Sequence, residues 1–433
     1  MKSLNLLGIH LVNRVEVEFL MQPGLTRRHL TDDTRNGITA LSTEYPMFQP
    51  DQIRQNVTFK AAVIILVIPA FAGCARSSGG IDGSWVSERE IDGTTTIIRT
   101  VSGSVWGGRA RLVEEASIGS VDGPDEYLIG RVTSIYADDG RIYIGDGDAV
   151  TVRVYDREGT WLFNVGRRGE GPGEFSRPRS ISVHPVTGDI FVRDGNRTRI
   201  NRYTSGGEIM ETWRLNVAFS TSLQSCMTHD GDLYTPVIVN ISNHSSDWQW
   251  GMALCQPEGA VGDTIPAPWF DYERAMIEVR VSETMYSNTY VPFTPSDSWV
   301  MLPSLNMVGG VGTEYRFEIH HPDDRVTVVE RADWERVPVE PGERQWYRDY
   351  NTASFRQEVP GWAWNGPEIP FHKPPFEQFI PDRSGRIWVL REGPGIHLEG
   401  GDDHPRTYEG FMRNPAWEHS WFVDVFDEEG RFL

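Results

Sequence analysis

Two aspartates, Asp146 and Asp194, occupy equivalent positions in two similar segments and could bind a hard cation. Asp146 follows the run Ile-Tyr-Ile-Gly and Asp194 follows Ile-Phe-Val-Arg. Carboxylate oxygens are ligands that Ca²⁺ prefers, so one hypothesis is that these two side chains bind Ca²⁺ or another divalent cation. The alternative is that each carboxylate caps a turn by accepting hydrogen bonds from backbone N–H groups. The sequence favours capping, because no His or Glu recurs at a spacing that would complete a cation site.

Four arginines lie in and just after a glycine-rich stretch and could bind an anion. They are Arg167, Arg168, Arg177 and Arg179. The formal net charge of the chain is −20, so a local group of guanidinium side chains stands out. A guanidinium can bind a carboxylate through two parallel hydrogen bonds. The group is therefore a candidate site for a carboxylate or an anionic glycan, and the alternative is a solvated surface loop.

The sequence contains no recognisable catalytic motif and predicts no catalytic residue. Residues 169–175, Gly-Glu-Gly-Pro-Gly-Glu-Phe, lack the Lys-Ser/Thr pair of a phosphate-binding loop, and there is no nucleophile elbow. Residues 320–324, His-His-Pro-Asp-Asp, could bind zinc. Proline followed by two acids is, however, typical of a hairpin turn, and the sequence favours that interpretation. These observations favour a binding protein over an enzyme.

The candidate residues belong to a repeated pattern of short strands and turns. In residues 169–203 a glycine-rich turn precedes the strand around Ile181, a second strand follows at residues 190–192, and a third begins at Ile200. The same pattern occurs one repeat earlier, since Asp146 and Asp194 are 48 residues apart. Weaker copies occur at residues 231–234 and 385–389. A period of about 40–50 residues is typical of β-propeller blades, and several blades must pack together to bury their apolar faces.

Residues 171–200 resemble the NHL repeat of six-bladed β-propellers. That repeat runs Gly-Pro-Gly-x-Phe, Pro, an apolar strand, Gly-x-Ile-Tyr-Val-x-Asp and Asn-x-Arg-Ile. Here the fourth of these parts reads Gly-Asp-Ile-Phe-Val-Arg-Asp, at residues 188–194. The looser resemblance covers about residues 127–433 and is closest to the bacterial envelope-lipoprotein branch. It implies an all-β propeller of six blades. We expect residues 83–89 and 94–105 to pair with the last blade, which is otherwise left incomplete by the end of the chain.

A helical insertion interrupts the strand pattern at residues 340–375. Residues 340–357 are expected to form a helix, because Pro341 suits a first turn and Trp346, Tyr350 and Ala353 lie on one helical face. The Pro- and Trp-rich residues 360–375 follow. Their tryptophans could stack on sugars, but the sequence favours a role in sealing the helix against the propeller.

The beginning of the chain indicates where the protein is located. Residues 47–73 resemble a bacterial lipoprotein signal peptide, with a short apolar run and small residues before Cys74. The apolar run is too short for a transmembrane helix, which needs about 20 residues. We expect a lipid on Cys74, a linker at residues 74–82, the propeller at residues 83–433, and a non-native or disordered extension at residues 1–46. The resemblance implies the bacterial cell envelope and favours the outer membrane.

The expected function follows from charge, location and the missing motifs. A net charge of −20 argues against nucleic acid, because phosphates need a basic surface. We expect a monomeric, lipid-anchored propeller that binds a glycan, a peptide or an envelope protein as a binding or scaffold module. The alternative is a metal-dependent hydrolase or lyase with its site in the central channel of the propeller.

Overall fold

The computed structural model describes residues 85–195, 198–217, 223–240, 248–282, 286–399 and 416–433, with the backbone alone for residues 109–115. Earlier in the chain it gives β1 (Ile9–Glu18), β2 (Thr39–Ala40) and β3 (Leu66–Val67). β1 pairs antiparallel with β6 (Arg109–Ile118). Cys74 and the linker after it lie outside the described residues, so lipidation stays a prediction.

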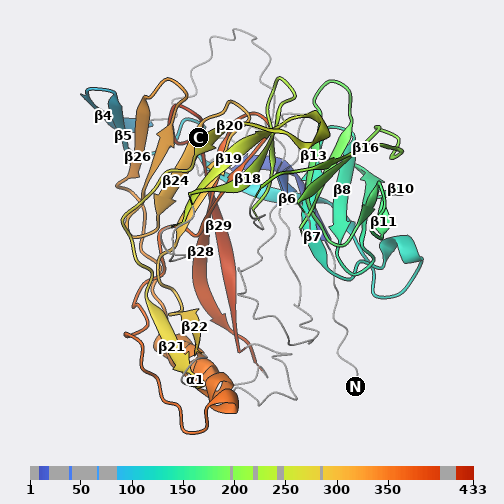
Figure 1. The fold of residues 1–433 in the computed structure, drawn as a ribbon. Helices are drawn as coiled ribbons and strands as arrows, with labels where there is room; N and C mark the ends of the chain where they lie inside the picture. Colours follow the sequence, from blue (N-terminus) through green and yellow to red (C-terminus); the bar gives the residue numbers. More distant parts are fainter. Residues whose placement is uncertain are drawn as a thin grey trace.

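Three antiparallel meanders of four strands form consecutive blades, as the repeat predicts (Figure 1). The first blade is β7 (Val132–Ala137), β8 (Arg141–Asp146), β9 (Thr151–Asp156) and β10 (Trp161–Val165). The second is β13 (Pro178–Val183), β14 (Ile190–Asp194), β15 (Arg199–Tyr203) and β16 (Ile209–Arg214). The third is β17 (Cys226–Met227), β18 (Leu233–Asn240), β19 (Gln249–Cys255) and β20 (Val261–Pro266).

Two further sheets complete a β-propeller of five to six blades, which confirms the predicted fold class. The fourth blade is β23 (Asp297–Met301), β24 (Met307–Val311), β25 (Arg316–His320) and β26 (Val326–Arg331). The fifth is β27 (Gln378–Pro381), β28 (Ile387–His397) and β29 (Trp417–Phe426).

The N-terminal strands β4 (Val86–Asp92) and β5 (Thr95–Ser102) pair with the fourth blade rather than the last, which corrects the expectation from the sequence, although Val105 beyond β5 donates its backbone N–H to the carbonyl of Phe432 at 2.8 Å. β5 pairs in parallel with β26, and β4 pairs with β5, so both extend the fourth blade. The pairing buries Ile98 and Thr100. Because an alternating strand fits any free sheet edge of similar length, its partner is not specified by its own sequence.

The core consists of apolar side chains packed between neighbouring blades. Between the first and second blades, Tyr143, Val152 and Val154 pack against Val192 and Tyr203. Ile142, Tyr143 and Ile144 are all buried although they are consecutive in β8, because both faces of a blade are covered. Phe317, Phe379 and Phe426 are fully buried between the fourth and fifth blades.

The predicted insertion forms part of a small lobe with its own apolar core. We define the helical lobe as β21 (Met276–Arg280), β22 (Tyr286–Tyr290), α1 (Pro341–Glu358) and residues 359–371. The predicted helix is confirmed to within one residue at each end. Trp362 is buried against Phe355 of α1, with ring centroids 4.9 Å apart, so it packs within the helical lobe, and a role in sealing the helix against the propeller stays a prediction. β21, β22 and α1 lie at the lower end of Figure 1, and the long strands β28 and β29 extend toward them. No helix among the described residues is long and apolar enough to cross a membrane.

Candidate functional site

The carboxylate of Asp194 joins the end of β14 to the connection between the first two blades. It accepts hydrogen bonds from the backbone N–H groups of Ser176 and Arg177, each at 2.9 Å, and from Ser176 Oγ at 2.8 Å. Arg199, on the neighbouring strand β15, forms an ion pair with it at 3.1 Å. The Asp194 side chain is 0% exposed and that of Arg199 5% exposed. The two charges therefore compensate each other in the interior.

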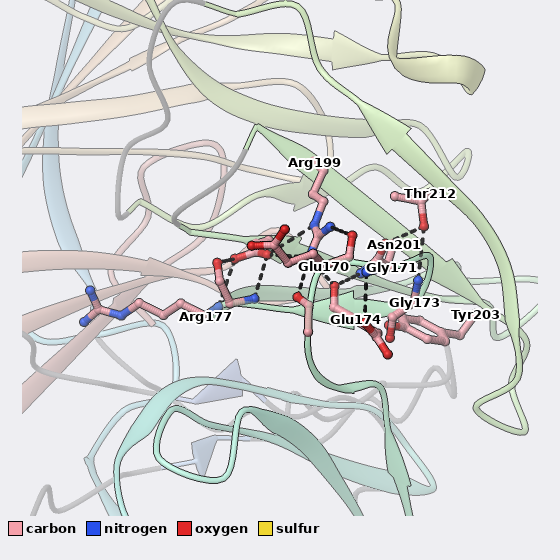
Figure 2. Close-up of polar contacts among 12 residues, drawn as sticks. Glu170, Gly171, Gly173, Glu174, Arg177, Arg199, Asn201, Tyr203 and Thr212 are labelled. Atoms are coloured by element: carbon pink, nitrogen blue, oxygen red, sulfur yellow. Dashed lines mark hydrogen bonds and ion pairs between the residues drawn. The ribbon is translucent and has the colours of Figure 1, made fainter.

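Side chains of β15 also satisfy the backbone carbonyls of the glycine-rich connection. Arg199 donates to the carbonyls of Gly169 and Glu170, at 3.3 and 3.0 Å. The hydroxyl of Tyr203 donates to the carbonyl of Gly173 at 2.9 Å. Figure 2 shows these contacts surrounding the connection. Because buried carbonyls need hydrogen-bond donors, this arrangement fixes the shape of the connection, and we call it the Asp–Arg clamp.

The first blade contains the same Asp–Arg clamp. Arg153 on β9 pairs with Asp146 at 3.0 Å, and its other nitrogens donate to the carbonyls of Asp125 and Leu128 at 2.8 and 3.1 Å. The hydroxyl of Tyr155 donates to a carbonyl of the same connection, that of Glu126, at 2.6 Å. The capping role that the sequence favours for the two aspartates thus recurs in both blades.

Asp146 and Asp194 lie in different blades, and each uses its carboxylate to hold an arginine and backbone N–H groups. A calcium ion at either position would have to displace a buried guanidinium. Within the described ranges, no group of three or more His, Cys, Asp or Glu side chains has a geometry suited to a metal ion. Calcium binding at these aspartates stays a prediction.

The residues of the predicted zinc motif form the β25–β26 turn, as the hairpin interpretation predicts. The backbone N–H of His321 donates to the carbonyl of Arg325 at 2.9 Å. The His321 ring contacts Asn306 Oδ1 and Thr327 Oγ1 at 3.1 and 2.9 Å, whereas His320 pairs with Glu318 at 2.9 Å. The two imidazole rings therefore have separate partners. A cavity of about 440 Å³ lies beside this turn, and its walls include Asp323 and Glu428.

Arg167 and Arg168 form the short strand β11 (Arg167–Arg168), which pairs in parallel with β12 (Glu174–Phe175). Arg167 is 81% exposed and contacts Glu174 at 3.0 Å. A hydrogen bond from the backbone of Gly171, and then the Arg167 guanidinium, hold the pKa of Glu174 below its ordinary value. Arg168 donates to the carbonyl of Asp148, at the end of the first blade, at 3.0 Å.

Arg177 and Arg179 flank the start of β13 and are both partly exposed. In Figure 2 Arg177 points away from Arg199 and the Asp–Arg clamp. A fifth arginine, Arg193 on β14, joins this group, and its side chain donates to the carbonyl of Leu223 in the next connection. Burial, and then the charge of Arg179, lower the pKa of Arg193 to about 10.

The sequence predicted four of these five arginines but missed Arg193. The signal for Arg193 was a basic residue inside the strand Ile-Phe-Val-Arg-Asp, since an arginine there must find partners when it is buried. All five residues lie in connections or strand ends on the same rim of the propeller. We call them the arginine rim: Arg167, Arg168, Arg177, Arg179 and Arg193.

A family model supports the propeller over about a third of the chain. Residues 120–264 match a family model described as "6-bladed beta-propeller". The structure is similar to a protein of unknown function from Bacteroides caccae, with 12% identity, a TM-score of 0.31, and 81% of this chain and 89% of that chain covered. For virginiamycin B lyase from Staphylococcus aureus the identity is 12% and the TM-score 0.28, with 66% and 82% covered. No curated protein matches the sequence.

Proposed function

We propose that this β-propeller is an envelope binding module that holds a carboxylate-bearing partner, an acidic peptide or an acidic glycan, at its arginine rim. The observation that carries the proposal is the grouping of Arg167, Arg168, Arg177 and Arg179 at the connection between the first two blades, with Arg167 81% exposed and Arg177 and Arg179 partly exposed. The buried Arg193 on β14 adds a fifth guanidinium, and the charge of Arg179 contributes to lowering its pKa. An anion bound at these guanidinium groups would gain charge-assisted hydrogen bonds.

The negative net charge of the chain means that the arginine rim can bind only anions that make direct hydrogen bonds with the guanidinium groups. The chain has a net charge of −20, and a field of that sign repels an anion at long range. Short-range hydrogen bonds from guanidinium groups must therefore supply the affinity. A planar carboxylate suits them better than a hydrated spherical anion, because its two oxygens match the fork of a guanidinium.

The arrangement supports binding better than metal-dependent catalysis. Asp146 and Asp194, which a catalytic metal in the channel would need, hold Arg153 and Arg199. The arginine rim has exposed donors instead, in Arg167 and the partly exposed Arg177 and Arg179.

Substitution at the arginine rim should weaken the binding of acidic probes. We expect Arg177→Ala/Arg179→Ala to weaken the binding of a labelled hexaglutamate peptide or of galacturonic acid oligomers at least about tenfold, since a charged hydrogen bond contributes about 1.5–3 kcal/mol. Arg167→Ala/Arg168→Ala should also weaken binding, because these side chains belong to the same arginine rim. Fluorescence anisotropy measures both.

The matched control is Arg157→Ala, a loop arginine at the opposite rim whose contact is the carbonyl of Asp139. It should leave affinity unchanged. Equal affinity of the wild type and the Arg177→Ala/Arg179→Ala variant for both probes would contradict the proposal. Binding of one probe alone would identify the peptide or the glycan as the partner class.

The proposed location rests on lipidation of Cys74. We expect expression in a Gram-negative host with labelled palmitate to label the wild-type protein, and Cys74→Ser to remove the label and release the protein from the membrane fraction. Two or more acyl chains hold a protein firmly in a membrane, since each buried methylene contributes about 0.8 kcal/mol. Cys226→Ser is the control, because this cysteine lies within β17. Label that persists in Cys74→Ser would contradict lipidation at this residue.

A further inference from the structure

Four charged side chains meet in the interior where the helical lobe joins the fifth blade. Lys373 Nζ lies 3.1 Å from Glu343 and 3.4 Å from Glu392. His419 contacts the same two carboxylates, with Nε2 2.6 Å from Glu343 and Nδ1 2.6 Å from Glu392. The exposed fractions of the side chains are 0% for Glu343 and Lys373, 5% for Glu392 and 13% for His419. We call these four residues the charge tetrad.

The charge tetrad joins four separate parts of the chain. Glu343 belongs to the first turn of α1, Glu392 to β28 and His419 to β29, and Lys373 lies just beyond the helical lobe. With His419 protonated, two anions meet two cations and the sum of charges is zero. Since a buried charge without a partner costs several kcal/mol, the charge tetrad favours the docked lobe only while both cations are present.

Close packing links the charge tetrad to the position of α1. Glu343 Oε2 accepts a hydrogen bond from the backbone N–H of Glu340 at 3.2 Å and so caps the helix. A Cβ atom at Gly395 would lie 2.6 Å from Glu343 Oε2, so a larger residue there would push the Glu343 carboxylate out of its present position. The ring of Tyr347 stacks on His419 with centroids 6.3 Å apart. Movement of α1 away from the blade would therefore separate Glu343 from both cations.

A fifth titratable side chain, Glu377, lies beside the charge tetrad, and its backbone N–H donates to the carbonyl of Leu390 at 2.8 Å. Burial, and then the charge of Glu392, raise the pKa of Glu377 to about 8. Burial lowers the pKa of His419, but hydrogen bonds to Glu343 and Glu392 more than offset this and raise it to about 8. Both groups are protonated at neutral pH when the lobe is docked.

We propose that the charge tetrad and Glu377 form a proton-dependent latch, which docks the helical lobe against the fifth blade and releases it as the medium becomes alkaline. The titratable and charged groups that face His419 and Glu377 are Glu343 and Tyr347 of α1, Glu392 of β28, Lys373, and Arg274 before β21. Loss of both protons changes the summed charge of the five side chains of the charge tetrad and Glu377 from zero to −2. The latch is independent of the arginine rim.

The direction of the pH dependence follows from proton linkage. His419 and Glu377 both have a docked pKa above the ordinary value, so docking takes up protons. The contribution of His419 is complete below its ordinary pKa of 6.5 and is lost as the pH rises through about 8. Glu377 has the same sign, and its loss is complete at about pH 8. Docking is therefore strongest in acid and weakest above about pH 8.

Hydrogen exchange of the full chain tests the latch without any substitution. We expect amide protection in α1, corrected for intrinsic exchange rates, to fall at least about tenfold between pH 6.5 and pH 9, because one pKa unit corresponds to a factor of ten. Protection in β14 of the second blade should stay constant and serves as the internal reference. Constant protection of α1, or an equal fall in β14, would overturn the proposal.

Three variants assign the effect to the named residues. His419→Gln should lower α1 protection already at pH 6.5 and flatten its pH dependence. Glu377→Gln stays neutral at every pH and should retain more protection than the wild type at pH 9. His320→Gln is the matched control, because His320 also pairs with a glutamate, Glu318 at 2.9 Å, but is 38% exposed. If His419→Gln fails to fold, Glu377→Gln decides alone. If α1 protection in Glu377→Gln falls between pH 6.5 and pH 9 as much as in the wild type, Glu377 has no role in the latch.

Discussion

Replacing Lys373 by methionine should lower the free energy of unfolding by about 3–5 kcal/mol, the range measured when one partner of a buried ion pair is removed. The substitution leaves Glu343 and Glu392 with His419 as the remaining cation of the charge tetrad. Methionine fills a similar volume, so the loss is electrostatic rather than a cavity effect. Urea denaturation followed by tryptophan fluorescence and circular dichroism measures it.

The control for Lys373→Met is Arg348→Met in the same helical lobe. Arg348 pairs with Glu368, which is 73% exposed. An ion pair open to solvent contributes at most about 1 kcal/mol, so this variant should remain close to the wild type. If both variants lose the same stability, the charge tetrad has no special role. If Lys373→Met is as stable as the wild type, the tetrad does not hold the lobe.

The repeat could be read from the sequence because each blade uses local signals. Residues 169–203 contain their own turns, apolar strands and capping aspartate, and the structure has a blade there. The partner of β5 could not be read in this way, since pairing with β26 joins residues more than 200 positions apart. The local sequence pattern thus predicts where the strands are. Which strand pairs at the edge of a blade depends on packing between distant segments of the chain.

The Asp–Arg clamp was visible only in part. Asp146 and Asp194 were singled out by their repeat spacing, but their partners Arg153 and Arg199 follow at different intervals. Each pair meets because the two strands are neighbours in a blade, and the register places Asp194 opposite Arg199. When only the aspartates repeat at a regular spacing, the sequence pattern resembles that of a metal site. The strand register is needed to recognise that each aspartate forms an ion pair with an arginine.

The charge tetrad could not be predicted, because its members are scattered between positions 343 and 419 and share no motif. They meet because β28 and β29 extend beyond the fifth blade and α1 docks on them. One signal was present: Lys373 is the only lysine after Lys60. A chain that uses arginine almost everywhere else places a lysine where a compact ammonium group must fit between two carboxylates.

Replacing Asp194 by asparagine should cost about 3–5 kcal/mol of stability and loosen the connection between the first two blades, because it leaves the buried Arg199 without its anion. Hydrogen exchange should increase in residues 169–177. Asp148→Asn is the control, since its side chain is 61% exposed and lies 3.6 Å from Arg131; we expect a loss below about 1 kcal/mol.

A second substitution separates the Asp–Arg clamp from calcium binding. If Asp194 serves as the clamp, Asp194→Asn/Arg199→Met should be more stable than Asp194→Asn alone, because it removes the uncompensated cation along with its partner. Added Ca²⁺ or a chelator should then leave the melting temperature of the wild type unchanged. If Asp194 binds calcium instead, Ca²⁺ should raise that temperature by mass action, and Asp194→Asn should abolish the rise. In that case Asp194→Asn/Arg199→Met should be less stable than Asp194→Asn alone, since the carboxylate and the guanidinium would contribute to stability independently.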